Sequence, residues 1–347
     1  MQPVARQPVL DAFWRLAAER QQIYFRRHEG LPAPWTTDAI LTEYKFCNAY
    51  RASDRVSQYL IRDVIYAPGR YGSDDQLLRI VLFRLFSKPA TWELLVDAFG
   101  DVTAATFDAD AYAAVLDHAF AARRTLYTGA FILCANRAYG HERKHRNHLA
   151  LLEAMMTPGS LEQDVARAAT LRDLYEALAR YPLIGPFMAY QLAIDINYSE
   201  LTDFSENECS IAGPGAKRGI AKCFVEPRGW NEDRIIRWMT DRQDDEFARL
   251  RLDFRNLHGR PLHAIDIQNL FCEVDKYSRV AFPDLKSNRS RIKSRFTPTG
   301  PLPEPFFAPK WKIEPGNGGV SAAHCGRQSS SAADERPLVA GDQRALW

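Results

Sequence analysis

Five carboxylates stand close together in the segment 195–208, namely Asp195, Glu200, Asp203, Glu206 and Glu208. They lead directly into the sequence Ala-Gly-Pro-Gly-Ala at residues 212–216. A carboxylate can act as a general acid or base, or stabilise positive charge at a sugar carbon. Gly213 and Gly215 allow close backbone approach or a positive φ, as in loops that hold a phosphate. The alternative for each acid taken singly is a solvated loop carboxylate.

Basic side chains and a tight turn flank this acidic segment. Lys217, Arg218 and Lys222 follow the glycines on an expected new helix, where they could hold a phosphate backbone. Ahead of the acids, residues 182–186 form a tight turn that ends at Gly185 and Pro186, and a helix is expected from 187 to 197. Backbone amides at such a helix start suit a phosphate, and a corner packed only for shape is the alternative.

A second group of polar residues recurs at three- and four-residue spacing, namely Asn48, Arg51, Arg55 and Gln58. If one helix carried all four, they would share a face and could contact bases or phosphates. The structural alternative is an ion pair between Asp54 and one of the two arginines, which would stabilise a helix junction.

The segment 266–279 is predicted to be a helix with one polar and one apolar stripe. We expect its polar residues to form a buried network that contacts the substrate, with the candidates Asp266, Gln268, Asn269, Lys276 and Arg279. From residue 276 to residue 295, seven basic residues stand against one acid, a local charge of +6. This run favours a phosphate-facing patch, and a solvated basic surface is the ordinary alternative.

Composition limits the class of protein. The 347 residues include 46% apolar and 25% charged residues, which is typical of a globular chain. With 45 basic and 43 acidic residues the net charge is only +2, so any nucleic-acid surface must be local. The longest uncharged stretch is 14 residues, too short for a membrane span, and the N-terminus has no secretory signal. We therefore expect a cytoplasmic protein. The six scattered cysteines show no metal-ligand pattern. The histidines at 141, 145 and 148 would share one helical face, so zinc is an alternative there, but no further ligand motif accompanies them and no metal site is expected.

Apolar residues recur at helical spacing along most of the chain, and period-2 runs are absent. This pattern predicts an all-α protein of about eleven helices, with helices over 38–50, 54–66 and 74–86. We expect residues 1–312 to form one helical unit, with two lobes flanking a cleft as one arrangement. The proline-rich stretch after residue 297 is expected to wrap the surface irregularly, and residues 313–347 to form a flexible tail.

Several of these segments, in order, resemble one known family. They are FCNAYRASDRVSQYL (46–60), LFRLFSKPATWELL (82–95), PLIGPFMAYQLAIDINYS (182–199), IAGPGAKRGIAKCF (211–224) and DIQNLFCEVDKYSR (266–279). The chain resembles, over roughly residues 40–312, the α-glutamyl/putrescinyl thymine pyrophosphorylase family, also labelled the helical domain of 5-hydroxymethyl-deoxyuridine DNA kinases. The family is regarded as a relative of helix-hairpin-helix DNA glycosylases and acts on hypermodified bases in phage DNA.

The resemblance implies a glycosylase-like helical fold and double-stranded phage DNA with modified bases as the partner. Residues 182–189 match the glycosylase hairpin, with Leu183 where a glycine usually stands. The catalytic acid of that superfamily would fall between Asp203 and Glu208, so Glu206 and Glu208 are the leading candidates and Asp195 follows. We therefore expect a monofunctional DNA glycosylase that excises a bulky modified pyrimidine, such as glucosylated hydroxymethylcytosine, in antiphage defence.

Two alternatives to the glycosylase stay open at this point. One is a transferase that replaces a pyrophosphate on 5-hydroxymethyluracil with an amino acid or amine, and the other is a non-catalytic modified-DNA binder. The chain lacks the G-x-x-x-x-G-K-[ST] phosphate loop, so phosphorylation by this chain alone is not expected. No cofactor, no membrane and no obligate protein partner are expected.

Overall fold

The structure is a computed structural model that describes residues 1–129, 137–157, 160–285, 287, 292–297 and 302–313. It is mostly helical, which confirms the all-α prediction. Among these residues one small antiparallel strand pair joins β1 (Val4–Ala5) to β2 (Phe224–Glu226). No helix in the described part of the chain is long and apolar enough to cross a membrane. Except for Ile313, the predicted tail lies outside the described residues.

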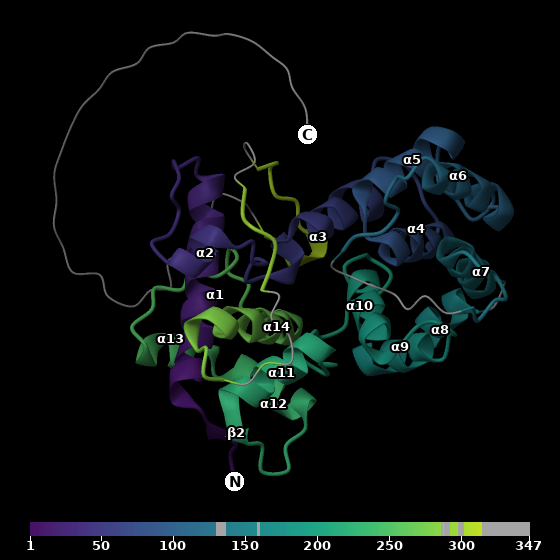
Figure 1. The fold of residues 1–347 in the computed structure, drawn as a ribbon. Coiled ribbons are helices and arrows are strands. Elements are labelled where there is room, and N and C mark those ends of the chain that lie inside the picture. The colour runs from purple at the N-terminus through teal and green to yellow at the C-terminus, as the bar shows by residue number, and fades with distance from the viewer. Residues whose placement is uncertain (130–136, 158–159, 286, 288–291, 298–301, 314–347) are drawn as a thin grey trace, which may run out of the picture.

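The terminal lobe combines the beginning of the chain with its last helices (Figure 1). It contains α1 (Gln7–His28), α2 (Ala39–Glu43), α11 (Pro214–Cys223), α12 (Glu232–Asp241), α13 (Gln243–Arg249) and α14 (Ala264–Ala281). Helix α14 lies at its centre and packs against α1, α11 and α12. The rings of Phe13 and Phe271 lie 4.7 Å apart between α1 and α14, and both side chains are fully buried.

Glycines allow α11 to lie directly against α14. A Cβ on Gly219 would lie 1.9 Å from the carbonyl oxygen of Phe271, and one on Gly215 would lie 2.3 Å from Sγ of Cys272. Gly213 is the N-cap of α11, and a Cβ there would meet the ring of Phe187 at 2.7 Å. None of these glycines has a positive φ. The close backbone approach expected at Gly213 and Gly215 does occur, but it is toward neighbouring protein atoms, and phosphate binding at these glycines stays a prediction.

Replacing Gly219 with alanine should destabilise the protein by about 1–3 kcal/mol or more, because the added methyl group meets rigid backbone. Urea denaturation followed by circular dichroism measures this change. Gly185→Ala is the matched control, since no atom lies within 4 Å of a Cβ at that position. Equal losses in the two variants would contradict the packing role of Gly219.

The central lobe lies between the two parts of the terminal lobe in sequence (Figure 1). It contains α4 (Ser73–Phe86), α5 (Pro89–Phe99), α6 (Ala109–Ala121), α7 (Lys144–Met156), α8 (Leu161–Arg167), α9 (Leu171–Ala179) and α10 (Pro186–Ile196). Every residue from 77 to 86 is buried, so α4 forms the centre of this lobe and packs against α7, α8 and α10. The prediction of a helix after the turn at 182–186 is confirmed by α10.

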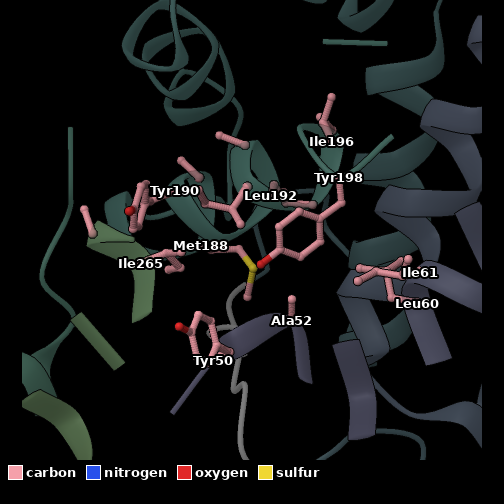
Figure 2. Packing of buried hydrophobic residues seen from close by; sticks show 14 of the residues in the cluster. Tyr50, Ala52, Leu60, Ile61, Met188, Tyr190, Leu192, Ile196, Tyr198 and Ile265 are labelled. Carbon is pink, nitrogen blue, oxygen red and sulfur yellow. The ribbon is translucent and has the colours of Figure 1, made fainter. Parts of the chain in front are cut away.

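A helical rod connects the lobes and corresponds to the helix predicted over 54–66. It starts after the 3₁₀ turn η1 (Arg51–Ser53), runs through α3 (Arg55–Tyr59) and continues as the π-helix η2 (Leu60–Ile65). The helix predicted over 38–50 ends already at Glu43, since the chain turns extended at Tyr44. Figure 2 shows how Tyr50 and Ala52 from one lobe edge meet Met188 and Tyr198 of the other around buried side chains.

The segment 302–313, which we call the C-terminal strap, wraps across the two lobes as predicted for the proline-rich stretch. Phe306 exchanges two backbone hydrogen bonds with the side-chain amide of Gln58, at 2.8 and 3.0 Å. Its short 3₁₀ helix η3 (Pro309–Trp311) places Lys310 so that Nζ donates to the carbonyl oxygens of Asn197 and Ser199, both at 2.7 Å. The strap therefore stabilises the C-terminal end of α10, where carbonyl groups lack helical partners.

Candidate functional site

A buried ion network lies where α10, α4 and η1 meet, and Asp195 is at its centre. The Asp195 carboxylate accepts a hydrogen bond from Nη2 of Arg51 at 2.8 Å. It also accepts hydrogen bonds from both Nε and Nη2 of Arg84. All three side chains are at most 2% exposed. Asp195 is thus a buried counter-charge for two arginines, a role that differs from its predicted place as the third candidate for the catalytic acid.

The Asp195 network continues into the terminal lobe through Asp266. The Asp266 carboxylate accepts from the backbone N–H groups of Arg51 at 2.7 Å and His263 at 2.9 Å, so it joins η1 to the start of α14. Arg260 lies close enough to lower its pKa, but burial dominates and raises the pKa of Asp266 to about 7. Asp266 is 3% exposed, so it is a buried lobe contact and lies away from any open surface.

The five acids of the segment 195–208 do not form one site. Glu206 is 5% exposed and pairs with Nη2 of Arg260 at 2.6 Å, whose guanidinium lies over the ring of Trp311 in the strap. Glu208 accepts from the backbone N–H of Leu171 at the start of α9. Asp203 is exposed, 3.8 Å from Lys310. Only Glu206 and Asp195 point into the same buried region, because the chain turns after α10.

The basic residues after the glycines also form ion pairs with acids of the same chain. Arg218, Lys222 and Arg279 converge on the buried carboxylate of Asp275, at 3.0, 3.1 and 2.6 Å. Lys217 is exposed and lies 3.6 Å from Glu232. Arg218, Lys222 and Arg279 thus share one internal acid, and their predicted contact with phosphates stays a prediction.

The group at 48–58 does not share one helix face, because η1 interrupts the helix. The Asn48 side chain accepts from Arg20 at 2.9 Å and donates to the carbonyl oxygen of Ser53 at 2.8 Å. Gln58 donates to the carbonyl oxygen of Ala52 and pairs with the strap. These two side chains stabilise the helix junction. This structural role is the alternative given from the sequence, where an ion pair of Asp54 with an arginine was expected instead of these hydrogen bonds. Arg55 alone of the group is exposed.

The predicted polar stripe of α14 is an internal network in part. Glu273 is 3% exposed and binds Lys276 at 2.7 Å and Lys293 at 2.6 Å, and these two charges outweigh burial and lower its pKa to about 2. Gln268 is buried, and its Oε1 has no hydrogen-bond partner among the described residues. Asn269 is half-buried. Three residues of the predicted basic run, Lys286, Arg289 and Arg291, lie outside the described residues.

The hairpin at 182–186 contains a left-handed backbone conformation at a residue that is not glycine. Leu183 has φ of 67°, in the left-handed region that glycine usually occupies. Gly185 is the N-cap of α10 with an extended φ of −75°, so it does not need to be glycine. The turn therefore has the local shape of a tight hairpin while the unusual φ falls on Leu183.

A surface that sequence analysis missed gathers three cations from three segments, and we call it the Arg27–Arg55 patch. It consists of Arg27 at the end of α1, Lys45 after α2 and Arg55 at the start of α3. The segment 294–296 lies between two of these cations, since the carbonyl oxygen of Ser294 accepts from the backbone N–H of Lys45 at 3.0 Å and the ring of Phe296 lies 5.8 Å from the guanidinium of Arg27. Burial and then the positive charge of Arg55 lower the pKa of both Arg27 and Lys45. Within the described residues none of the three forms an ion pair.

Aromatic rings accompany the cations of this patch. The guanidinium of Arg27 lies 5.0 Å from the ring of Trp35 and 5.8 Å from that of Phe296. Close like charges without acidic partners repel one another, and a bound anion relieves that repulsion. Cations beside aromatic rings are typical of surfaces that bind nucleic-acid strands. The only signal in the sequence was Arg55, because the other two cations stand 10 and 28 positions earlier.

The raised pKa of Asp266 predicts a pH dependence of stability. The folded protein keeps this proton up to about pH 7, whereas the unfolded chain loses it near the ordinary aspartate pKa of 3.8. Unfolded chains therefore bind fewer protons between these values, and stability falls as pH rises, by at most about 1.4 kcal/mol per pH unit.

The comparison with Asp266→Asn isolates this effect, because histidines with lowered pKa, such as His145 and His263, oppose it in both proteins below about pH 6.5. The stability of the wild-type protein minus that of the variant should decrease between pH 5 and pH 7, as measured by urea denaturation. A difference that stays constant with pH would contradict a protonated Asp266.

Comparison with known proteins gives the family. The sequence profile described as "5-hmdU DNA kinase, helical domain" matches residues 7–287. The chain belongs to this family. A 5-hmdU DNA kinase of Bacillus phage SP10 is 27% identical over 296 residues, which cover 79% of this chain and 46% of the relative. The chain thus spans less than half the length of that relative. No solved structure matches the chain.

These findings overturn the expected activity. Both the family and the phage relative carry the name of a DNA kinase, an enzyme that transfers a phosphoryl group, whereas a glycosylase hydrolyses the bond between base and sugar. The prediction of a DNA glycosylase is therefore wrong, and with it the assignment of Glu206 and Glu208 as hydrolytic acids. The comparisons support the 5-hmdU DNA kinase helical-domain part of the resemblance and do not show the glycosylase relationship.

Proposed function

We propose that this chain acts in the phosphorylation of 5-hydroxymethyl-deoxyuridine in DNA, by binding the DNA that carries the modified nucleotide. The family supplies the substrate class, since the phage relative is named for 5-hmdU DNA. The observation that carries the proposal is the Arg27–Arg55 patch, whose three cations form no ion pair among the described residues and in which Arg55 lowers the pKa of the other two. Other candidate cations, such as Arg218 and Lys222, form ion pairs with Asp275.

The physical basis of binding is neutralisation of phosphates. DNA carries closely spaced negative charges, and cations that replace its condensed counterions release them into solution. The chain as a whole carries a net charge of only +2, so attraction must come from a local patch. Trp35 and Phe296 beside the patch add ring surfaces on which unpaired bases can stack.

Two measurements with the purified chain test the proposal. Fluorescence anisotropy compares binding to duplexes of identical sequence that carry either 5-hydroxymethyl-deoxyuridine or thymidine at one position. A second assay follows transfer of radiolabelled phosphate from ATP, with Mg²⁺, to the same two duplexes. We expect tighter binding to the modified duplex, and any label to enter that duplex alone. Equal binding together with no transfer, or equal transfer to both duplexes, would contradict the proposal.

A further inference from the structure

A cleft with a cavity volume of about 700 Å³ opens beyond the C-terminal end of the helical rod. Its walls come from the segment 65–76, which links η2 to α4, and from residues 199–201 after α10. The volume falls in the range of about 300–1,000 Å³ that small-molecule sites have. Of the five carboxylates that the sequence singled out, Glu200 lines this cleft.

One wall of the cleft is the aromatic ring of Tyr71, which three neighbouring residues hold in place. The Tyr71 ring lies 4.0 Å from the guanidinium carbon of Arg79, and its hydroxyl donates to Asp101 at 3.2 Å. Gly69, with φ of 141°, lies so close that a Cβ there would be 2.8 Å from the same ring. Arg79 lies over the face of the ring and Gly69 lies against its hydroxyl end, so the Tyr71 ring is held in a fixed position in the cleft wall before any ligand binds.

The polar groups of the cleft are mainly hydrogen-bond acceptors. The Glu200 carboxylate is bound by the hydroxyl of Tyr66 at 2.7 Å, and the residue is otherwise exposed. Gln76 donates from Nε2 to the carbonyl oxygen of Ile65, which leaves its Oε1 buried and without a partner among the described residues. A buried acceptor without a donor is costly, so a ligand that brings a donor is favoured.

The charges of the cleft disfavour a polyphosphate. Arg70 is the one cation among the lining residues, and Glu200 opposes it. The N-terminus of α4 carries Asp74 and Asp75 in its first turn, and the Asp75 carboxylate accepts from Gly72 and Ala104. The partial positive charge at the N-terminus of α4 is thus already balanced by these two acids. A planar, uncharged ligand with hydrogen-bond donors fits these groups best.

We propose that this cleft receives the 5-hydroxymethyluracil base of the DNA substrate, an inference that rests on the proposed function. The base stacks on Tyr71, its ring N–H donates to Gln76 Oε1, and its hydroxymethyl O–H donates to Glu200. Thymine has the same ring but lacks the hydroxyl donor, so Glu200 discriminates between the two bases. A site that hydrogen-bonds a hydroxyl of its substrate rejects the analogue without that hydroxyl more strongly than an apolar pocket rejects an extra group.

The position of the cleft relative to the Arg27–Arg55 patch agrees with a bound strand. Arg55 and Ile65 stand at the two ends of the same helical rod, 10 residues apart. At about 1.5 Å per residue this separation is roughly 15 Å, or about four base-pair steps of 3.4 Å. An enzyme that modifies a base must take it out of the stack, and a cleft at this distance can accept it while the patch holds flanking phosphates.

Binding titrations with the full chain and the two duplexes test this assignment. Tyr71→Ala should weaken binding of the modified duplex roughly tenfold or more, because base–aromatic stacking is lost, while Tyr71→Phe should retain it. Glu200→Ala should bring the preference for 5-hydroxymethyl-deoxyuridine over thymidine close to one, and Glu200→Gln, which keeps an acceptor, should restore part of it. Glu176→Ala, an exposed acid on α9, is the matched control.

The outcomes separate the two proposals. If the wild-type chain prefers the modified duplex and Glu200→Ala retains that preference with an unchanged melting temperature, the cleft assignment is wrong and the proposed function stands. If the wild-type chain has no preference and transfers no phosphate to either duplex, the proposed function fails; if it has no preference but phosphorylates the modified duplex alone, only the cleft assignment is wrong. Competition by the free nucleosides distinguishes the source of the ligand. Displacement by free 5-hydroxymethyl-deoxyuridine at low micromolar concentration, without any effect of Tyr71→Ala on duplex binding, would overturn a DNA-base cleft.

Discussion

Exchanging Lys45 and Arg55 for glutamate together is expected to weaken DNA binding about 100-fold in roughly 0.1 M salt. Both side chains are exposed and have no ion pair within the described residues, so the double variant should fold normally. The exchange removes two phosphate contacts and adds two charges that repel the backbone. The slope of log affinity against log salt concentration should therefore become shallower by about 2, since each contact contributes about 0.9. Fluorescence anisotropy over a series of salt concentrations measures both quantities.

A double variant alone could act through net charge, so the control must change charge elsewhere. Arg124 is exposed at the end of α6 in the central lobe, and Arg124→Glu should leave the salt slope unchanged. A loss of affinity in the control as large as half of that in the double variant would assign DNA binding to overall charge. Unchanged affinity in the double variant would remove the observation on which the proposed function depends.

Asp195→Asn is expected to lower the free energy of unfolding by about 3–5 kcal/mol. The substitution keeps the size of the side chain but leaves the charges of Arg51 and Arg84 buried without a counter-charge. An uncompensated buried charge costs more than the ion pair contributes, which is why breaking such a pair from one side is severe. Urea denaturation monitored by tryptophan fluorescence gives the change in stability.

Asp203→Asn is the matched control for this experiment, eight positions further along the chain. Its side chain is 87% exposed and lies 3.8 Å from Lys310, so the expected change is within about 0.5 kcal/mol. A loss below about 1 kcal/mol for Asp195→Asn would show that the two arginines find other partners. The same experiment tests the contact between the two lobes, since Arg51 binds Asp195 of the central lobe with its side chain and Asp266 of the terminal lobe with its backbone N–H.

The Asp195 network also sets where the two proposed binding surfaces lie relative to each other. Arg51 directly precedes the helical rod, which carries Arg55 at one end and borders the cleft at the other. The pairs from Arg51 to Asp195 in α10 and to Asp266 in α14 therefore hold the rod against both lobes. Loss of Asp195 should affect DNA binding through this positioning, even though the side chain is far from solvent.

Local sequence was sufficient for the helical class and for several helix positions, because apolar spacing and helix-terminating residues act within one or two turns. The helix predicted over 74–86 is α4, and the one after the turn at 182–186 is α10. The predicted wrapping of the proline-rich stretch is seen in the strap. The resemblance carried by the five quoted segments led to the correct family, although it was extended too far to a glycosylase.

The roles of charged residues were decided by packing between distant segments. Arg51 and Asp195 stand 144 positions apart, and Arg218 and Asp275 stand 57 apart, so no local pattern shows that these charges neutralise each other. The glycines at 213 and 215 looked like a phosphate loop because conformational freedom and close contact with neighbouring protein atoms require the same residue. Conversely, Arg27, Lys45 and Arg55 become one surface only when three segment ends meet. Spacing along a helix determines which side chains share a face, but the partner of that face depends on how whole helices pack.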